Sequence, residues 1–312
     1  MEITGSRFVD PLTLKPVRLS PGAIAALAGE LKPNKASPLS AFASLKAAPN
    51  TADLDALGIT HAARPTGGSG KGKLYRQALE TLAAPEATLT MAEVGGGQPP
   101  LSVRIVLGAE RAVMADVDSD GLSLSPPVSY PELVKALARH FENTPMYAEQ
   151  RAFWPSQLKL LTALFSNEAG ALELEVGAAG VKVCFDRSGV AEAEGKQVLE
   201  ELVKHQLIEA KAGGAYALGE NAAFWLTRLA TGQIGELTWV LYDEAGNAQP
   251  QSTELRFVGA PKDRVTMVTV RGEELKGLVG GEAPESAGVV CQVMDRGALS
   301  GFLEAYLGLA QE

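Results

Sequence analysis

Three short segments of this chain contain residue types that could do chemistry, and the first is a glycine loop. Its sequence from Gly67 to Lys73, GGSGKGK, fits the pattern GxxxxGK. In a phosphate-binding loop of that pattern, backbone N–H groups and the lysine cradle a nucleotide, and the next residue is a Ser or Thr that binds magnesium. That residue here is Leu74, and the preceding GITHAARP does not read as a buried strand. The sequence favours a flexible loop, so we expect no cofactor.

The second segment is the acidic turn DxDxDG formed by Asp116, Asp118, Asp120 and Gly121. The same letters open a calcium loop, in which alternate carboxylates converge on the cation. The bidentate glutamate that would close the loop belongs at position 127, which is proline. A β-hairpin turned at Asp120-Gly121 explains the pattern as well. We predict a hairpin and no metal centre, and the sequence leaves cation binding at this turn open.

The third segment, residues 195–218, looks like the last helix and wing of a winged-helix domain. In a DNA reader that helix enters the major groove with basic or amide side chains. Here the helix and its approach are mainly acidic: Glu192, Glu194, Glu200 and Glu201 against Lys196 and Lys204. The whole chain carries 28 Lys+Arg against 37 Asp+Glu, a net charge of -9 that repels a phosphate backbone. We predict no nucleic-acid binding; a winged-helix transcriptional regulator remains the alternative function, beside a small-ligand-binding domain.

The remaining reactive side chains form no recognisable catalytic set. The three histidines, His61, His140 and His205, have no metal or nucleophile spacing, and no GxSxG elbow occurs. The two cysteines, Cys184 and Cys291, lie in apolar runs where buried thiols are expected. We therefore predict no catalytic residues and no enzyme activity. Because the sequence MEITGSRFVDPLTLKP does not read as a signal peptide and no apolar run could span a bilayer, we expect a cytoplasmic protein without membrane insertion.

The elements that must position any site are predicted twice along the chain. From Ser20 and again from about Trp154 the order is a proline-capped helix, further helices, four strands and a closing helix. Alternation and turn residues predict two antiparallel meanders. Their strands are Thr88–Val94, Leu101–Leu107, Arg111–Asp118 and Leu122–Ser125, then Leu237–Asp243, Thr253–Val258, Arg264–Arg271 and Val289–Met294.

Residue-level matches support a duplication. Arg111 and Arg264 begin corresponding strands, and Leu133 and Leu299 lie in corresponding closing helices. We predict an α+β protein of two related halves, 1–148 and 149–312, each a meander sheet flanked by helices and related by a pseudo-twofold. The second half is expected to contain an additional hairpin, with strands Ala171–Val176 and Val181–Phe185.

This series of elements resembles the half-unit of the EspG-type chaperones of type VII secretion. The likeness is closest in QALETLAAPEATLTM, residues 77–91, and WLTRLA, residues 225–230, repeats it more faintly. The resemblance implies two related α+β halves and a cytosolic, non-enzymatic protein that shields an aggregation-prone helical partner, a small secreted protein, before export. No local motif identifies contact residues that could be transferred from the family.

Strand alternation predicts where a partner would dock. In the second strand of each meander, Val103 and Ile105, and likewise Leu255 and Phe257, point to the face that helices should cover. The opposite face then carries Arg104 and Arg256, with Tyr242 expected nearby on the adjacent strand. Arg and Tyr often carry interface energy, so this face is our predicted partner-binding site. The alternative is a solvated surface with weak local ion pairs.

Overall fold

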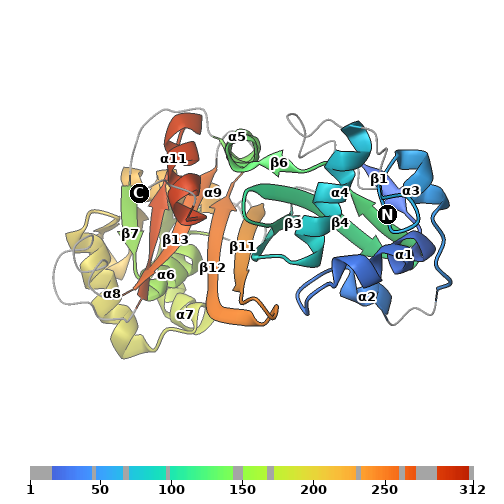
Figure 1. The fold of residues 1–312 in the computed structure, drawn as a ribbon. Helices are drawn as coiled ribbons and strands as arrows, with labels where there is room; N and C mark the ends of the chain where they lie inside the picture. Colours follow the sequence, from blue (N-terminus) through green and yellow to red (C-terminus); the bar gives the residue numbers. More distant parts are fainter. Residues whose placement is uncertain are drawn as a thin grey trace.

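A long antiparallel sheet of eleven strands runs through the molecule and joins both halves of the chain (Figure 1). The structure is a computed structural model, and it describes residues 16–43, 47–65, 70–95, 99–142, 150–166, 172–229, 233–259, 264–271 and 287–308. The strand order is β1-β5-β4-β3-β2-β11-β12-β13-β14-β7, and β6 pairs with β4. The α+β class with a large antiparallel sheet is therefore confirmed.

The two predicted meanders form the middle of this sheet. Their strands are β2 (Ala87–Val94), β3 (Leu101–Leu107), β4 (Arg111–Asp118) and β5 (Gly121–Leu124), then β11 (Ile234–Tyr242), β12 (Ala248–Val258), β13 (Val265–Arg271) and β14 (Ala287–Gln292). The edges are β1 (Val17–Leu19) and β7 (Gln150–Phe153), and β6 is Val128–Ser129. The meanders meet where β2 pairs with β11, with Thr90 opposite Thr238. They therefore form one continuous sheet.

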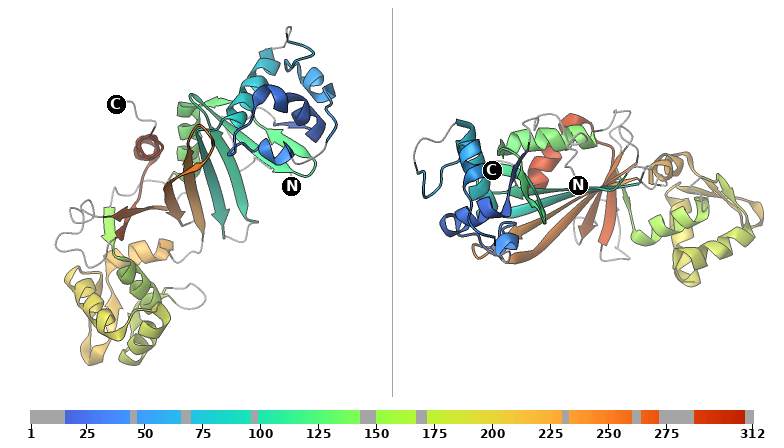
Figure 2. Two further views of the ribbon diagram at one scale, coloured as in Figure 1. Left: turned by 60° about the horizontal axis from the view of Figure 1, so that its bottom comes forward. Right: turned by 90° about the vertical axis from the view of Figure 1, so that its right-hand side faces the viewer.

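The helices gather in three groups around the sheet (Figures 1 and 2). The first group is α1 (Pro21–Leu31), α2 (Ser40–Ala43), α3 (Ala52–Leu57) and α4 (Gly70–Ala83). The second is α5 (Tyr130–Phe141) with α11 (Arg296–Tyr306), which lie side by side. The third is α6 (Pro155–Phe165), α7 (Ala178–Ser188), α8 (Glu192–Lys204) and α9 (Glu220–Leu229), with the small sheet β8 (Glu175–Val176), β10 (Tyr216–Leu218) and β9 (Ile208–Ala210) and the 3-10 turn Ala212–Gly214.

Local sequence explains where the helices begin. Ser20 accepts a hydrogen bond from the backbone of Ala23 ahead of the first-turn Pro21 of α1. In α5, Ser129 and Glu132 form a capping box, and in α11 Asp295 accepts from the backbone of Ala298. These side chains satisfy backbone donors that would otherwise lack partners at a helix start.

Each helix group has its own core. The pair α5 and α11 covers one face of the central strands through Leu137, Phe141 and Leu303, which pack on Leu89, Leu237 and Phe257. The α1–α4 group covers the opposite face at the β4–β5 end, and the α6–α9 group covers that same opposite face at the β13–β14 end. Hydrophobic burial therefore fixes both ends of the sheet and one face of its middle.

The predicted additional hairpin is wrong. Residues 181–185 lie inside the helix α7, and of the first predicted strand only Glu175–Val176 is a strand, while residue 171 lies outside the described ranges. The letters Val181, Val183 and Phe185 alternate like a strand, but the buried positions are Val181, Cys184 and Phe185, which follow the helical period. Gly189 ends the helix with φ 67°, a left-handed cap that glycine adopts easily. None of the helices in the described ranges is long and apolar enough to cross a bilayer.

Candidate partner-binding face

Among the residues that the structure describes, no helix group covers one face of the middle of the sheet. Side chains directly opposite each other in paired strands point to the same face. Arg104 on β3 lies opposite Thr90, and Thr90 lies opposite Thr238. A second row runs from Ser102 through Ala92 and Glu236 to Arg256, as the pairing of β3, β2, β11 and β12 shows. We call this surface of β3, β2, β11 and β12 the open face.

The open face ends where the outer helices begin. At one end Val106, two residues after Arg104, is fully buried against the α1–α4 group. At the other end Met267, opposite Arg256, packs against the α6–α9 group. The alternate residues Leu89, Ile105, Leu255 and Phe257 are buried beneath α5 and α11 on the reverse side. The arginines therefore lie on the face opposite the helix-covered one, as the alternation predicts.

The chemistry of the open face is polar and cationic. Arg104 is exposed and has no ion-pair partner in the described part of the chain. Arg256 is half exposed, and its Nε lies 2.9 Å from Oε1 of Glu236. An ion pair this exposed contributes at most about 1 kcal/mol. Thr88, further along the same face of β2, has a buried hydroxyl for which the described residues offer no hydrogen-bond partner.

Tyr242 shares this face but is farther from Arg256 than expected. It ends β11 opposite Ala248, whereas Arg256 lies opposite Glu236. Six residues of strand separate the two rows, which is about 20 Å at the usual rise. The two arginines are closer to each other, since two intervening strands separate them by about 14 Å across the sheet. Tyr242 can contribute only to a partner that extends along the strands.

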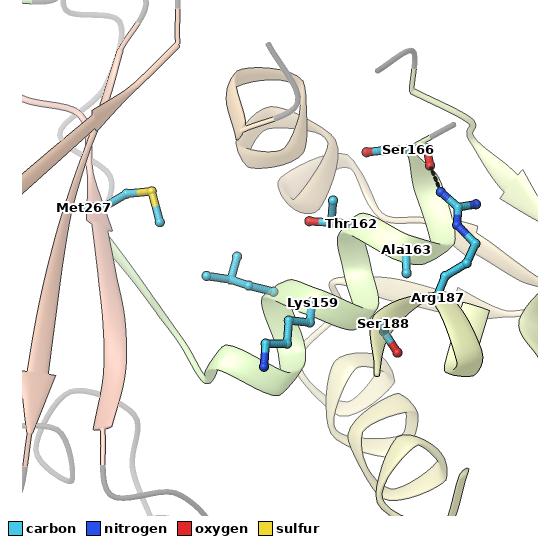
Figure 3. Close-up of a pocket in the computed structure, with 8 residues that line it drawn as sticks. Lys159, Thr162, Ala163, Ser166, Arg187, Ser188 and Met267 are labelled. Atoms are coloured by element: carbon cyan, nitrogen blue, oxygen red, sulfur yellow. Dashed lines mark hydrogen bonds between the residues drawn. The ribbon is translucent and has the colours of Figure 1, made fainter. Parts of the chain in front are cut away.

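A cavity adjoins the open face at its β13 end (Figure 3). Its volume is about 480 Å³, and it lies between α6, the end of α7 and Met267 on β13. The apolar part of the lining is Leu158, Ala163 and Met267, and the polar part is Lys159, Thr162, Ser166, Arg187 and Ser188. These lining residues were not predicted from the sequence. The spacing of Leu158, Thr162 and Ser166 could have indicated that they share one side of α6.

A buried charged cluster lies elsewhere and links the halves. Glu93 at the end of β2 lies 2.8 Å from Arg264 and 3.0 Å from His140, as measured from Oε1 to the nearest nitrogen of each. Burial alone would raise the pKa of Glu93, but the hydrogen bonds and charges of His140 and Arg264 outweigh it and lower that pKa. Arg264 also lies over the ring of Phe141. Every member has a charged neighbour, which is typical of a structural ion cluster.

The two loops singled out in the sequence have structural explanations. The helix α4 begins at Gly70, inside the GxxxxGK segment, while residues 66–69 lie outside the described ranges. In the acidic turn, Asp118 Oδ1 accepts hydrogen bonds from the backbone of Asp120 and Gly121 and pairs with Arg18. The hydrogen bond from Arg18 lowers the pKa of Asp118. The turn is the predicted hairpin, and in the described residues no group of three His, Cys, Asp or Glu side chains could hold a metal ion.

Both cysteines are buried, and two of the histidines have carboxylate neighbours. Cys184 and Cys291 are buried free thiols, and burial raises the pKa of Cys291 to about 12. A thiol with so high a pKa is a poor nucleophile at neutral pH. His61 is buried and lies 3.3 Å from Asp55, while His140 belongs to the cluster of Glu93. Burial and these contacts explain the two cysteines, His61 and His140 as structural groups.

The winged-helix-like segment lies at the far end of the molecule from α1–α4 (Figure 1). Helix α8 is followed by β9, the turn Ala212–Gly214 and β10. The exposed side of α8 carries Glu192, paired with Lys196 at 2.8 Å, and further glutamates. This part of the surface is therefore predominantly acidic.

The chain was compared with protein families, curated proteins and solved structures. Neither a protein-family profile nor a curated protein sequence matches this chain. Among solved structures, the chain is similar to the type VII secretion system chaperone EspG5 of Mycobacterium tuberculosis, solved in complex with the PE25–PPE41 dimer. The TM-score is 0.46 at 10% identity, over 95% of this chain and 97% of that chain. The resemblance to EspG-type chaperones noted in the sequence is thereby confirmed as a resemblance.

Proposed function

We propose that this chain is a non-enzymatic partner-binding protein that holds a helical protein partner on the open face. The observation that carries the proposal is a central sheet that helices cover on one face, while no described residues cover the other face between two helix groups. A sheet face with a helix group on either side forms a recess in which a helix of the partner can pack. In this proposal α5 and α11 stabilise the sheet from behind.

The dimensions of the open face fit one helix. Four strands at the usual spacing span about 14 Å between the outermost strand axes, and an α-helix with its side chains is about 10–12 Å across. Arg104 and Arg256 on the two outer strands would then lie on either side of the bound helix. Arg and aromatic residues are the types in which interface energy concentrates. Tyr242 would touch the partner only if the helix ran toward the β11–β12 turn.

A chaperone-like role in secretion is the specific form of this proposal. The sequence resemblance implies it, and EspG5 was solved with the PE25–PPE41 dimer bound. For this chain we propose a cytoplasmic protein that shields a small helical partner before export. The polar character of the open face suits such a role, because a temporary partner must leave again and polar interfaces are typical of transient complexes.

We further propose that the two halves are a duplication related by a pseudo-twofold, with 1–148 and 149–312 as the units. The strand orders from the centre outward are β2-β3-β4-β5-β1 and β11-β12-β13-β14-β7, and each series runs through its half in the same chain order. Superposing the two halves tests this. The winged-helix-like segment 195–218 would be an elaboration of the second unit.

The test of the docking face is partner capture by a double variant. In affinity purification from the source organism, Arg104→Glu/Arg256→Glu should lose at least tenfold of the partner that the unchanged protein captures, about 1.4 kcal/mol. The thermal midpoint should stay nearly unchanged because both side chains are exposed. The matched control is Lys135→Glu/Lys204→Glu, which makes the same change of charge at exposed positions on α5 and α8. Equal capture by the two double variants would exclude the open face.

A further inference from the structure

The cavity beside the open face has features of a built binding site. Met267 lies at the boundary between the two, because it lies opposite Arg256 in the sheet and also lines the cavity. Figure 3 shows the Met267 side chain pointing from β13 toward α6. A partner lying on the open face would therefore reach the cavity without leaving the surface. The cavity volume of about 480 Å³ is within the range of ligand sites.

One polar residue of the cavity lining, Ser166, is buried. Ser166 is only 8% exposed, and its hydroxyl is buried and has no hydrogen-bond partner within the described residues. Ser166 ends α6, and its carbonyl already accepts a bond of 3.0 Å from Arg187 Nη2. Buried hydroxyls are almost always hydrogen-bonded in folded proteins.

The charge at the cavity has one sign. Lys159 and Arg187 are exposed cations in the lining, and neither has a carboxylate partner among the residues that the structure describes. None of the described lining residues carries a carboxylate. The chain as a whole carries a net charge of -9, whereas the two charged residues of the described lining are cations. Such a site attracts an anion and disfavours a cation.

We propose that this cavity anchors an acidic, aliphatic segment of the helical partner. An aliphatic side chain fills the space between Leu158, Ala163 and Met267, and a carboxylate one helical turn away binds Lys159 and Arg187. The inference rests on the proposed function, because it takes the occupant to be the partner held on the open face.

The test uses a synthetic probe and a reporter in the cavity. The probe is a capped alanine-based helical peptide with one Leu and, four residues later, one Glu; the reporter is the ¹³C-labelled Met267 methyl resonance, assigned with Met267→Leu. The Leu/Glu peptide should shift this resonance saturably. Peptides with Leu→Ala or Glu→Gln should bind at least tenfold more weakly, as should free 4-methylpentanoate.

Variants of the protein locate the binding. Thr162→Trp places a large side chain at an exposed position of the lining and should abolish the shift, whereas Gln197→Trp on the exposed side of α8 should not. Lys159→Gln/Arg187→Gln should remove the preference for Glu over Gln. No saturable shift, no such preference, or equally tight binding of 4-methylpentanoate would overturn the proposal, the last by indicating a small-molecule site. Because capture tests the open face and the peptide tests the cavity, either proposal can fail without the other.

Discussion

Among individual residues, Glu93 is the carboxylate that pairs with the buried Arg264. Arg264 is 7% exposed and Glu93 is its carboxylate partner, so Glu93→Gln would leave a buried guanidinium without its counter-charge. Breaking a buried pair in this way costs about 3 kcal/mol. We expect the free energy of unfolding, measured in urea, to fall by about that amount. Glu192→Gln, which breaks an exposed pair, should leave the urea midpoint unchanged.

The same residue predicts a pH dependence. Because the pKa of Glu93 is lower in the folded protein than in the unfolded chain, its contribution to stability is fully present above the unfolded pKa, near 4.5. It is lost as the pH falls through the lower, folded pKa. Unfolding curves of Glu93→Gln and the unchanged protein should therefore converge as the pH falls below about 4. A constant difference down to pH 2 would contradict this assignment.

Among the elements, the contact between α3 and α4 depends on one glycine. A Cβ on Gly72 would lie 1.8 Å from the carbonyl oxygen of Gly58, which ends α3 with φ 68°. The clash is with backbone and cannot be relieved by a rotamer. We expect Gly72→Ala to destabilise the protein by at least ~2 kcal/mol in thermal or urea unfolding. Gly70→Ala in the same helix meets nothing within 4 Å and should change stability by less than about 0.5 kcal/mol.

The elements were predictable where local signals agreed. Every strand end of the first meander was predicted to within one residue, because polar turns such as Asp120-Gly121 separate alternating runs. The helix α7 was missed because alternating valines imitate a strand, while its true period shows only in which side chains are buried. The edge strands β1 and β7 were missed because three or four residues provide too little pattern.

At the scale of the whole molecule, the decisive contacts are non-local. The pairing of β2 with β11 joins segments about 150 residues apart, and nothing in either strand alone specifies it. The open face exists only because of that pairing, since it unites the polar alternate positions of both meanders. Alternation was enough to place Arg104 and Arg256 on one kind of face. The cavity could not be predicted, because Lys159, Thr162 and Arg187 are ordinary helix residues until α6 and α7 pack against β13.

The central claim is that the open face receives the partner, and site-specific photocrosslinking tests it most directly. A photoreactive phenylalanine analogue is placed at Ser102, exposed on the open face, or at Lys135, exposed on α5 behind the sheet. Both proteins are irradiated in the source organism, and adducts are identified by mass spectrometry. We predict one dominant adduct from Ser102, with a small protein of helical sequence, and none from Lys135. An adduct from Lys135 without one from Ser102 would contradict the account.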